Sequence, residues 1–458
     1  MAVNAGARLD RLPMSGFHRR ILWLIGIGMF FDGFDIYIAS TVLGATVASK
    51  FSTLGGNALF MSMTFVGMTI GSLATGFLGD RFGRRFTYQV NLMVFGLASL
   101  AAALAPNMAV LIACRFVMGV GLGAENVVGY STLTEFVPPA ARGRMQGIMT
   151  VFVVCGLPIS ALLGRVLVPV ATWRVMFVIG GLGAIAVWYV RKALPESPRW
   201  LAATGRDAEA EALLGSIEAE VAAERGPLPA VPAGEPPRFS RSLESLFAPA
   251  MMRRLVLGCL LLIVINTLIY GFITWLPTFF VKQGMTIVKS LSFTLVMVLG
   301  APVGSAIGAL SADRWGRRRT ILVASVVAVA VGAVYPFVAD PALVMVCGVA
   351  LVIPIYVLTA LLFGIYIPEL FPTEIRLRGS GICNTFGRAA TIGTQFLIVP
   401  LFERYGVAGV LALMIALLVL QIVAVAGWGI ETRGRTLEDV AADAALPSLP
   451  LATDVTAR

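Results

Sequence analysis

Twelve long stretches of mostly apolar residues dominate the sequence and constrain its fold more than any other feature. A helix needs ~20 apolar residues to cross the hydrocarbon core of a bilayer. The stretches cover residues 20–47, 57–79, 86–105, 109–133, 145–169, 173–191, 254–281, 289–311, 319–338, 342–368, 380–401 and 407–429. The shorter alternating segments typical of a transmembrane β-barrel do not occur in the sequence. We therefore predict an all-α membrane protein with twelve transmembrane helices.

The composition excludes the common soluble classes. Of the 458 residues, 58% are hydrophobic and 13% are charged, whereas soluble domains carry about 25% charged residues. The five cysteines show no CxxC spacing, no P-loop occurs, and the only histidine, His18, lies before the first apolar stretch. We therefore expect no metal, no cofactor, no ATP-driven pump and no enzyme active site.

The distribution of lysine and arginine predicts the orientation in the membrane. If both termini and every second loop lie inside, the inside segments hold 27 of the 35 basic residues and the outside loops hold 5. The other three, Arg115, Arg165 and Arg388, lie within apolar stretches. The positive-inside rule then predicts a multi-pass protein of the cell inner membrane with both termini cytoplasmic. The net charge of +10 reflects this topology and the anionic lipid headgroups, so we expect no nucleic-acid partner.

Two motifs recur at an offset of 233 or 234 residues. Residues 79–85 (GDRFGRR) match residues 312–318 (ADRWGRR), and residues 135–144 match residues 369–378. Both copies of each motif fall on the same side of the membrane. This predicts two parallel six-helix halves related by a pseudo-two-fold axis along the membrane normal. The expected domains are an N-terminal half (1–191), a cytoplasmic linker (192–252), a C-terminal half (253–430) and a cytoplasmic tail (431–458).

The repeated motifs resemble those of the major facilitator superfamily, and the resemblance extends over essentially all twelve stretches. Residues 195–200 (PESPRW), and Arg115 with the three glycines that follow it at 119, 121 and 123, resemble the sugar-porter and organic-ion-transporter branch. Residues 32–35 (DGFD) resemble the aromatic-acid and metabolite:proton symporters. One departure is Ala309, which stands in the second loop motif where the first has Gly76. The resemblance implies a monomeric transporter that works by alternating access.

Four charged residues inside the apolar stretches are candidates for proton coupling, because charge in the membrane is costly and defaults to a functional role. Asp32 and Asp35 share one helix face, and two nearby carboxylates in a low dielectric can share a proton. The resemblance pairs Asp35 with Arg115, so that protonation of Asp35 would break an ion pair; the alternative is a permanent structural bridge in a uniporter. Glu125 is a candidate second proton site, substrate contact or partner for Arg388, or else a structural hydrogen-bonding residue.

Arg388 is the most informative candidate for substrate binding. It lies in the eleventh stretch, always carries its charge, and can bind a carboxylate through two parallel hydrogen bonds. The alternatives are contact with lipid headgroups or pairing with Glu125. Aromatic and neutral polar residues on stretches that line the cavity in this fold offer stacking and hydrogen bonding. They are Tyr37, Asn126, Tyr130, Asn266, Tyr270, Trp275, Tyr356, Asn384 and Gln395.

The charged loop motifs predict conformational latches on the cytoplasmic side. The expected latch residues are Asp80, Arg81, Arg84, Asp313 and Arg317, with Glu135 paired to Arg142 or Arg144, and Glu369 paired to Arg376 or Arg378. Rocking of rigid halves requires ion pairs that break and re-form. The resemblance implies that these contacts favour the outward-facing state; the alternative is a purely structural role.

These features together favour proton-coupled import of a small organic acid, aromatic or otherwise. The expected partners are this small molecule, protons and the lipid bilayer. Two alternatives stay open: a sugar or organic-cation carrier or uniporter of the same fold, and a non-transporting membrane sensor. The short terminal tails argue against the sensor, because neither is long enough for a soluble domain.

Overall fold

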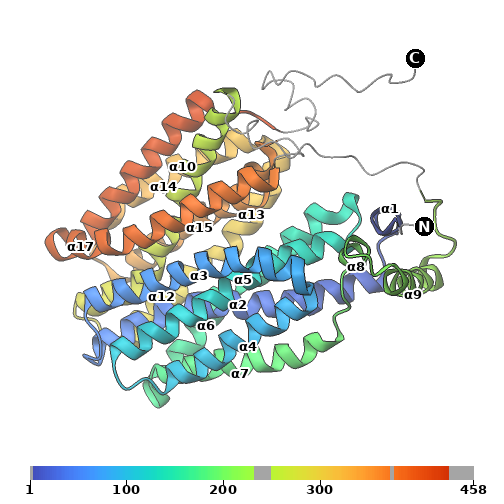
Figure 1. Cartoon of the computed structure of the whole chain (residues 1–458). Coiled ribbons are helices and arrows are strands. Elements are labelled where there is room, and N and C mark those ends of the chain that lie inside the picture. Colours follow the sequence, from blue (N-terminus) through green and yellow to red (C-terminus); the bar gives the residue numbers. More distant parts are fainter. Residues whose placement is uncertain (1–3, 232–248, 372–375, 433–458) are drawn as a thin grey trace.

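The computed structural model describes residues 4–231, 249–371 and 376–432, and within these ranges the chain forms helices and no strand (Figure 1). The N-terminal half consists of α2 (Gly16–Ala48), α3 (Leu54–Phe82), α4 (Arg84–Ala103), α5 (Met108–Phe136), α6 (Pro139–Ala171) and α7 (Arg174–Val190). Each of these six helices overlaps one predicted stretch and is long and apolar enough to cross a membrane.

The C-terminal half has the same number of crossings but more broken helices. Its elements are α10 (Pro249–Gly271), η3 (Ile273–Trp275), α11 (Leu276–Lys282), α12 (Ile287–Val298), α13 (Gly300–Trp315), α14 (Arg317–Val334), η4 (Tyr335–Phe337), α15 (Pro341–Leu361), the π-helical η5 (Leu362–Tyr366), α16 (Ile367–Glu369) and α17 (Arg376–Trp428). The backbone of α17 is interrupted at Gly406, whose φ is 64°. This glycine lies between the last two predicted stretches, so the eleven long apolar helices of the described residues make twelve crossings.

The helix pairs that pack together repeat from one half to the other. In the N-terminal half α2 packs on α6, α3 on α5 and α4 on α7. The equivalent pairs of the C-terminal half are α10 with the first part of α17, α13 with α15, and α14 with the last part of α17. The two halves meet through α3 with α17, α6 with α12, and α2 with α11. This arrangement confirms the predicted fold of two pseudo-symmetric six-helix halves.

Glycines allow α3 and α5 to approach closely. A Cβ atom on Gly71 would lie 1.9 Å from the carbonyl oxygen of Val120, and one on Gly123 would lie 2.0 Å from that of Met68. No larger side chain fits at these two positions. Close packing through small residues is a common way for transmembrane helices to associate. It holds the charged residues of α5 at a fixed distance from the neighbouring helices.

Three short helices gather at one end of the bundle, which we call the linker side: α1 (Ala5–Asp10), α8 (Pro198–Ala203) and α9 (Asp207–Arg225) (Figure 1). One face of α9 buries Leu214, Ile217 and Val221 in a cluster with Leu9 of α1. Above this apolar contact, Glu218 of α9 accepts hydrogen bonds from Arg8 at 2.6 Å and Arg11 at 2.7 Å. The N-terminal segment is therefore attached to the linker by both apolar and ionic contacts.

The ion pairs of Glu218 predict a pH-dependent attachment of α1. The hydrogen bonds from Arg8, and then those from Arg11, lower the pKa of Glu218 below its usual value. A lowered carboxyl pKa contributes stability at neutral pH that is lost as the pH falls through the folded-state pKa. We expect amide hydrogen exchange in α1 to quicken on acidification. Glu218→Gln should show the faster exchange already at neutral pH, by an amount equivalent to about 1 kcal/mol.

The matched control for this prediction is Glu209→Gln. Glu209 pairs with Arg206 three residues away on the same linker, at 2.6 Å, and forms no ion pair or hydrogen bond with the described residues of α1. Exchange in α1 should be unchanged in this variant. If Glu218→Gln and Glu209→Gln have equal effects on α1, the apolar contact alone attaches the N-terminal segment.

Candidate functional site

Asp35 of α2 and Arg115 of α5 form a buried ion pair in the N-terminal half. Nη1 of Arg115 donates to Oδ2 of Asp35 at 2.5 Å, and Nη2 donates to the backbone oxygen of Asp35 at 3.0 Å. The Nε of Arg115 donates to Thr64 of α3 at 3.1 Å, and its guanidinium lies over the ring of Phe60. Both charged side chains are fully buried. This is the contact that the family resemblance implied; its role in proton coupling stays a prediction.

The second acid of α2, Asp32, belongs to a different group of charges. Asp32 lies one helical turn after Gly28 on the same face of α2, and Gly28 packs against the guanidinium of Arg191. Asp32 and Glu125 are both buried, and Arg191 donates a hydrogen bond from Nη1 to Oε1 of Glu125. Of the alternatives for Glu125, a pairing with Arg388 is contradicted, because the ion-pair partner of Glu125 is Arg191.

Arg191 is the charged residue that sequence reasoning missed. It begins η1 (Arg191–Ala193) at the end of α7, where the positive-inside count treated it as a loop charge. In the structure its side chain is fully buried and donates to the backbone oxygens of Leu24 and Ile25 in α2, at 3.1 and 2.8 Å. An arginine at the edge of an apolar stretch carries no local signal that separates a membrane anchor from an inward-pointing side chain.

Arg388 lies where α17 of the C-terminal half meets α3 of the N-terminal half. Its Nη1 donates to the backbone oxygen of Met68 at 3.3 Å. Among the described residues no carboxylate forms an ion pair with it. The guanidinium is therefore half-buried at the boundary between the halves and keeps hydrogen-bonding capacity for another partner.

Aromatic side chains from both halves meet near Arg388. The rings of Phe65 in α3 and Tyr270 in α10 form an edge-to-face pair with centroids 4.6 Å apart. The hydroxyl of Tyr356 in α15 donates to that of Tyr37 in α2 at 3.2 Å. The structure thus brings Tyr37, Tyr270, Tyr356 and Arg388 to the boundary between the halves.

The other predicted substrate residues make hydrogen bonds within one half. Trp275 donates to Gln395 at 2.8 Å, and Asn266 and Asn384 each donate to a backbone oxygen four residues earlier in the same helix. Tyr130 shares a hydrogen bond of 3.2 Å with Thr150 of α6. The side chain of Asn126 lies outside the described part of the chain.

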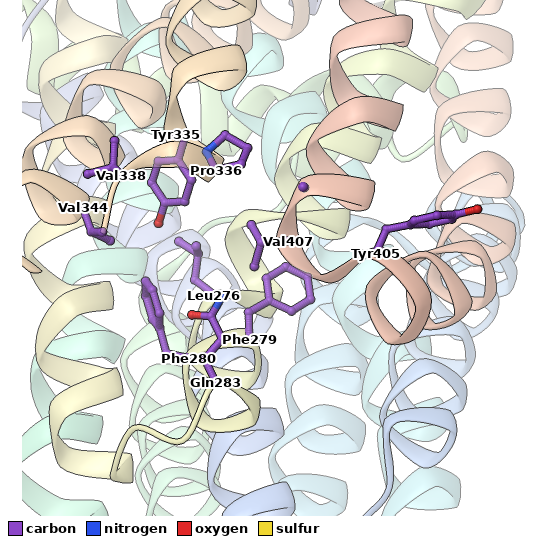
Figure 2. Close-up of a pocket in the computed structure, with 11 residues that line it drawn as sticks. Leu276, Phe279, Phe280, Gln283, Tyr335, Pro336, Val338, Val344, Tyr405 and Val407 are labelled. Carbon is purple, nitrogen blue, oxygen red and sulfur yellow. The ribbon is translucent and has the colours of Figure 1, made fainter. Parts of the chain in front are cut away.

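A cavity of about 270 Å³ lies in the C-terminal half but contains none of these residues (Figure 2). Its wall is formed by α11, η4 and the region around the break in α17, and Figure 2 shows Tyr405 pointing away from the other labelled side chains. Apolar residues make up most of the lining, and no charged residue belongs to it. Because it offers nothing to compensate an ionic ligand, we place the candidate site at the boundary around Arg388.

The linker side carries two equivalent charge clusters, one in each half. Arg84 donates to Glu135 at 3.0 Å, and Arg317 donates to Glu369 at 3.1 Å. The first turns of α4 and α14 are capped by carboxylates from distant segments: Glu196 accepts from the amide of Arg84, and Glu431 from that of Arg317, both at 2.9 Å. The capping residues Gly83 and Gly316 have no side chain, so these carboxylates satisfy the free amides.

Several ion pairs on the linker side join other residues than those predicted. Glu135 was expected to pair with Arg142 or Arg144. Instead Glu135 pairs with Arg84, Arg142 pairs with Asp10 of α1 at 2.6 Å, and Arg144 is exposed. Sequence proximity suggested the wrong partner because Arg142, in the first turn of α6, reaches Asp10 of the N-terminal segment.

The remaining latch residues are only partly described. Arg81 is exposed, with its guanidinium over the ring of Phe82. Arg378 lies near the start of α17 and is not without an interaction partner. Glu369, besides pairing with Arg317, accepts a hydrogen bond from Thr432 at 2.5 Å. The side chains of Asp80, Asp313 and Arg376 lie outside the described residues.

Twelve membrane-spanning helices in two equivalent halves, with charged and aromatic residues at the boundary between them, define a secondary transporter of the major facilitator superfamily. Residues 23–444 match the family model described as sugar (and other) transporter. The chain belongs to this family, which confirms the predicted superfamily and identifies a multi-pass membrane transporter rather than an enzyme.

Its relatives match it over nearly their full length. It is 35% identical to the inner membrane metabolite transport protein YdjE of Escherichia coli, with 95% of this chain and 98% of that protein covered. It is 31% identical to the niacin transporter NiaP of Acinetobacter baylyi, with 95% and 99% covered. Among solved structures, the inward-open xylose transporter XylE of E. coli shares the fold, with a TM-score of 0.72, 16% identity, and 93% and 99% of the two chains covered.

Proposed function

We propose that this transporter is a proton-coupled symporter that imports a small organic acid, with a ring-bearing acid as the favoured class. The observation that carries the proposal is Arg388, a half-buried guanidinium at the boundary between the halves that forms no ion pair with a described carboxylate. Such a cation next to the aromatic pair of Phe65 and Tyr270 suits a molecule with a carboxylate at one end and a flat ring at the other.

The similarity to the niacin transporter supports the same substrate class, because niacin is a carboxylic acid on an aromatic ring. A sugar or a cation would make little use of Arg388. The relatives also include an arabinose-proton symporter of Bacillus subtilis, at 25% identity, so a sugar is the second candidate. Transport of a neutral sugar would not depend on the charge of residue 388.

Proton coupling is supported by the acids of the N-terminal half. In this proposal protonation of Asp35 releases Arg115 from its ion pair and so changes how α2 and α5 are held together. Asp32 and Glu125 are further candidates for the proton. The similarity to XylE, which is described as a proton:xylose symporter, fits coupling but shares only the fold at 16% identity.

The transport cycle in this proposal is a rocking of the two halves around Arg388 and the aromatic residues. The pairs Arg84–Glu135 and Arg317–Glu369 act as latches on the linker side, which we take as the cytoplasmic side of the cell inner membrane from the lysine and arginine distribution. Residues 1–191 and 253–430 then form the moving halves of a monomer, joined by the linker 192–252.

Proton flux into proteoliposomes with a pH-sensitive dye inside tests the proposal. We would add benzoate, nicotinate, short aliphatic acids, hexoses and organic cations one at a time, with empty liposomes beside them because neutral weak acids leak through bilayers. Saturable acidification above this leak with one class of acid, lost in Asp35→Asn, is expected. Equilibration of labelled substrate without proton flux would contradict coupling, and activity with hexoses alone would contradict the substrate class.

A further inference from the structure

Asp32, Glu125 and Arg191 form a closed cluster inside the N-terminal half, on the linker side of Asp35 and Arg115. Asp32 and Glu125 are each 1% exposed and Arg191 is fully buried. Glu125 receives a hydrogen bond from Arg191 on Oε1, but its Oε2 and the Oδ2 of Asp32 have no hydrogen-bond partner among the described residues. The cluster thus has two carboxyl groups, one guanidinium and two buried oxygens without a donor.

The surrounding residues hold Arg191 in place. Its guanidinium donates to two backbone oxygens of α2, lies over the ring of Tyr88 with 4.6 Å to the centroid, and fills the space beside Gly28. A Cβ atom at position 28 would lie 1.9 Å from its Nη2, so any larger residue there would displace the guanidinium. Arg191 is held in the cluster by these contacts, and its proton is not available because arginine stays charged in proteins.

The charges of the cluster do not balance when both carboxyl groups are ionised. One negative charge would then be left in a site closed to water, which is strongly unfavourable. A single proton on Asp32 or Glu125 makes the cluster neutral. It also supplies a hydrogen-bond donor where two buried oxygens lack one, since an ionised carboxylate can only accept. The Asp35–Arg115 pair differs, because its one negative and one positive charge already balance.

We propose that Asp32, Glu125 and Arg191 form a proton-binding site of their own, separate from the Asp35–Arg115 pair, in which the two carboxyl groups share one proton. Arg191 from η1 packs against Gly28, one turn before Asp32 on the same face of α2, and its guanidinium is paired with Glu125 of α5. Asp35 lies one turn after Asp32 on α2, and Tyr88 of α4 stacks on Arg191. Arg191 is the positioning residue, because its hydrogen bond holds Glu125 in place. Its single positive charge balances one carboxylate, so one proton is needed to neutralise the other. The role of this proton in transport rests on the proposed function; its binding does not.

Infrared difference spectroscopy of the purified full-length protein tests the binding without any substrate. A protonated carboxyl group in an apolar site has a C=O stretch distinct from that of a carboxylate. We expect such a band in the intact protein. It should disappear in Asp32→Asn and also in Glu125→Gln, because each variant leaves one carboxylate balanced by Arg191. The matched control is Asp35→Asn, on the same helix, which should keep the band. A band lost only in Asp35→Asn, or no such band at any pH at which the protein is folded, would overturn the proposal.

Transport by the same variants tests the role of the proton. One pH unit across the membrane can drive about tenfold accumulation in a one-proton symport. The probe is nicotinate, and the signal from empty liposomes is subtracted. Asp32→Asn and Glu125→Gln should still exchange labelled for unlabelled nicotinate. Their ratio of internal to external nicotinate should stay at about one, without accumulation. Accumulation that persists in both variants would overturn the coupling role. If neither variant nor the intact protein moves nicotinate, nicotinate is excluded as a substrate while the infrared result still decides the proton site.

Discussion

Replacement of Arg388 by alanine is expected to reduce the uptake of an organic anion by about 100-fold or more. A carboxylate bound by a guanidinium makes two charge-assisted hydrogen bonds, and the loss of about 3 kcal/mol corresponds to roughly this factor. The effect should be seen in initial rates of labelled substrate uptake into proteoliposomes. Arg388→Lys keeps the charge but not the fork of donors, so it should retain a part of the activity.

Two comparisons make the Arg388 prediction specific. Arg404→Ala removes another arginine from the same helix, one that is exposed and lies beside Tyr405 near the break in α17, and it should leave uptake within about twofold. Transport of a hexose or of an organic cation by Arg388→Ala at the original rate would favour the alternative carriers. Unchanged uptake of the acid itself would show that Arg388 only joins α17 to α3 through Met68.

Removal of one member of the Asp35–Arg115 pair is expected to destabilise the protein strongly, by about 3–5 kcal/mol, because it leaves the other charge buried without a partner. Asp35→Asn and Arg115→Met should therefore both lower the unfolding temperature of the protein in detergent. The double variant Asp35→Asn/Arg115→Met contains no uncompensated charge and should recover most of this loss.

The double variant also separates the two interpretations of the pair. If the ion pair is purely structural, the double variant should recover transport together with stability. If the pair takes part in proton coupling, stability returns while proton-driven accumulation does not. Recovery of both properties in the same protein would leave Asp32, Glu125 and Arg191 as the site of proton coupling.

The architecture could be predicted from the sequence because the bilayer constrains the backbone of each apolar segment separately. Every backbone amide inside the hydrocarbon must be bonded within its own segment, so apolar stretches of sufficient length become helices. The repeats at 79–85 and 312–318 then revealed the two halves. The sequence did not reveal the π-helical turn at Leu362–Tyr366 of the C-terminal half, because this turn depends on packing against neighbouring helices.

For the candidate site, the sequence identified several of the charged residues but not all of their partners. Arg388 and Asp35 were recognised because charges inside apolar stretches are rare, and the contact of Asp35 with Arg115 came from the family resemblance. The partner of Glu125 was not recognised: Arg191 is 66 residues away and lies at the end of a stretch where a basic residue is expected in any case. Glu196 and Glu431 were missed for a similar reason, since each caps a helix more than a hundred residues earlier in the chain.

The number of helices that cross the membrane, their grouping and the charges among them follow from the sequence, because hydrophobic length and charge position are local properties of a chain. Which of these charges meet follows instead from how the helices pack in three dimensions. That choice depends on the face each helix turns towards its neighbours and on close approaches such as that of Arg191 to Gly28, where the absence of a single Cβ atom admits a guanidinium. Helix packing places Asp32 beside the Arg191–Glu125 pair, whereas Asp35, three residues later, forms its ion pair with Arg115.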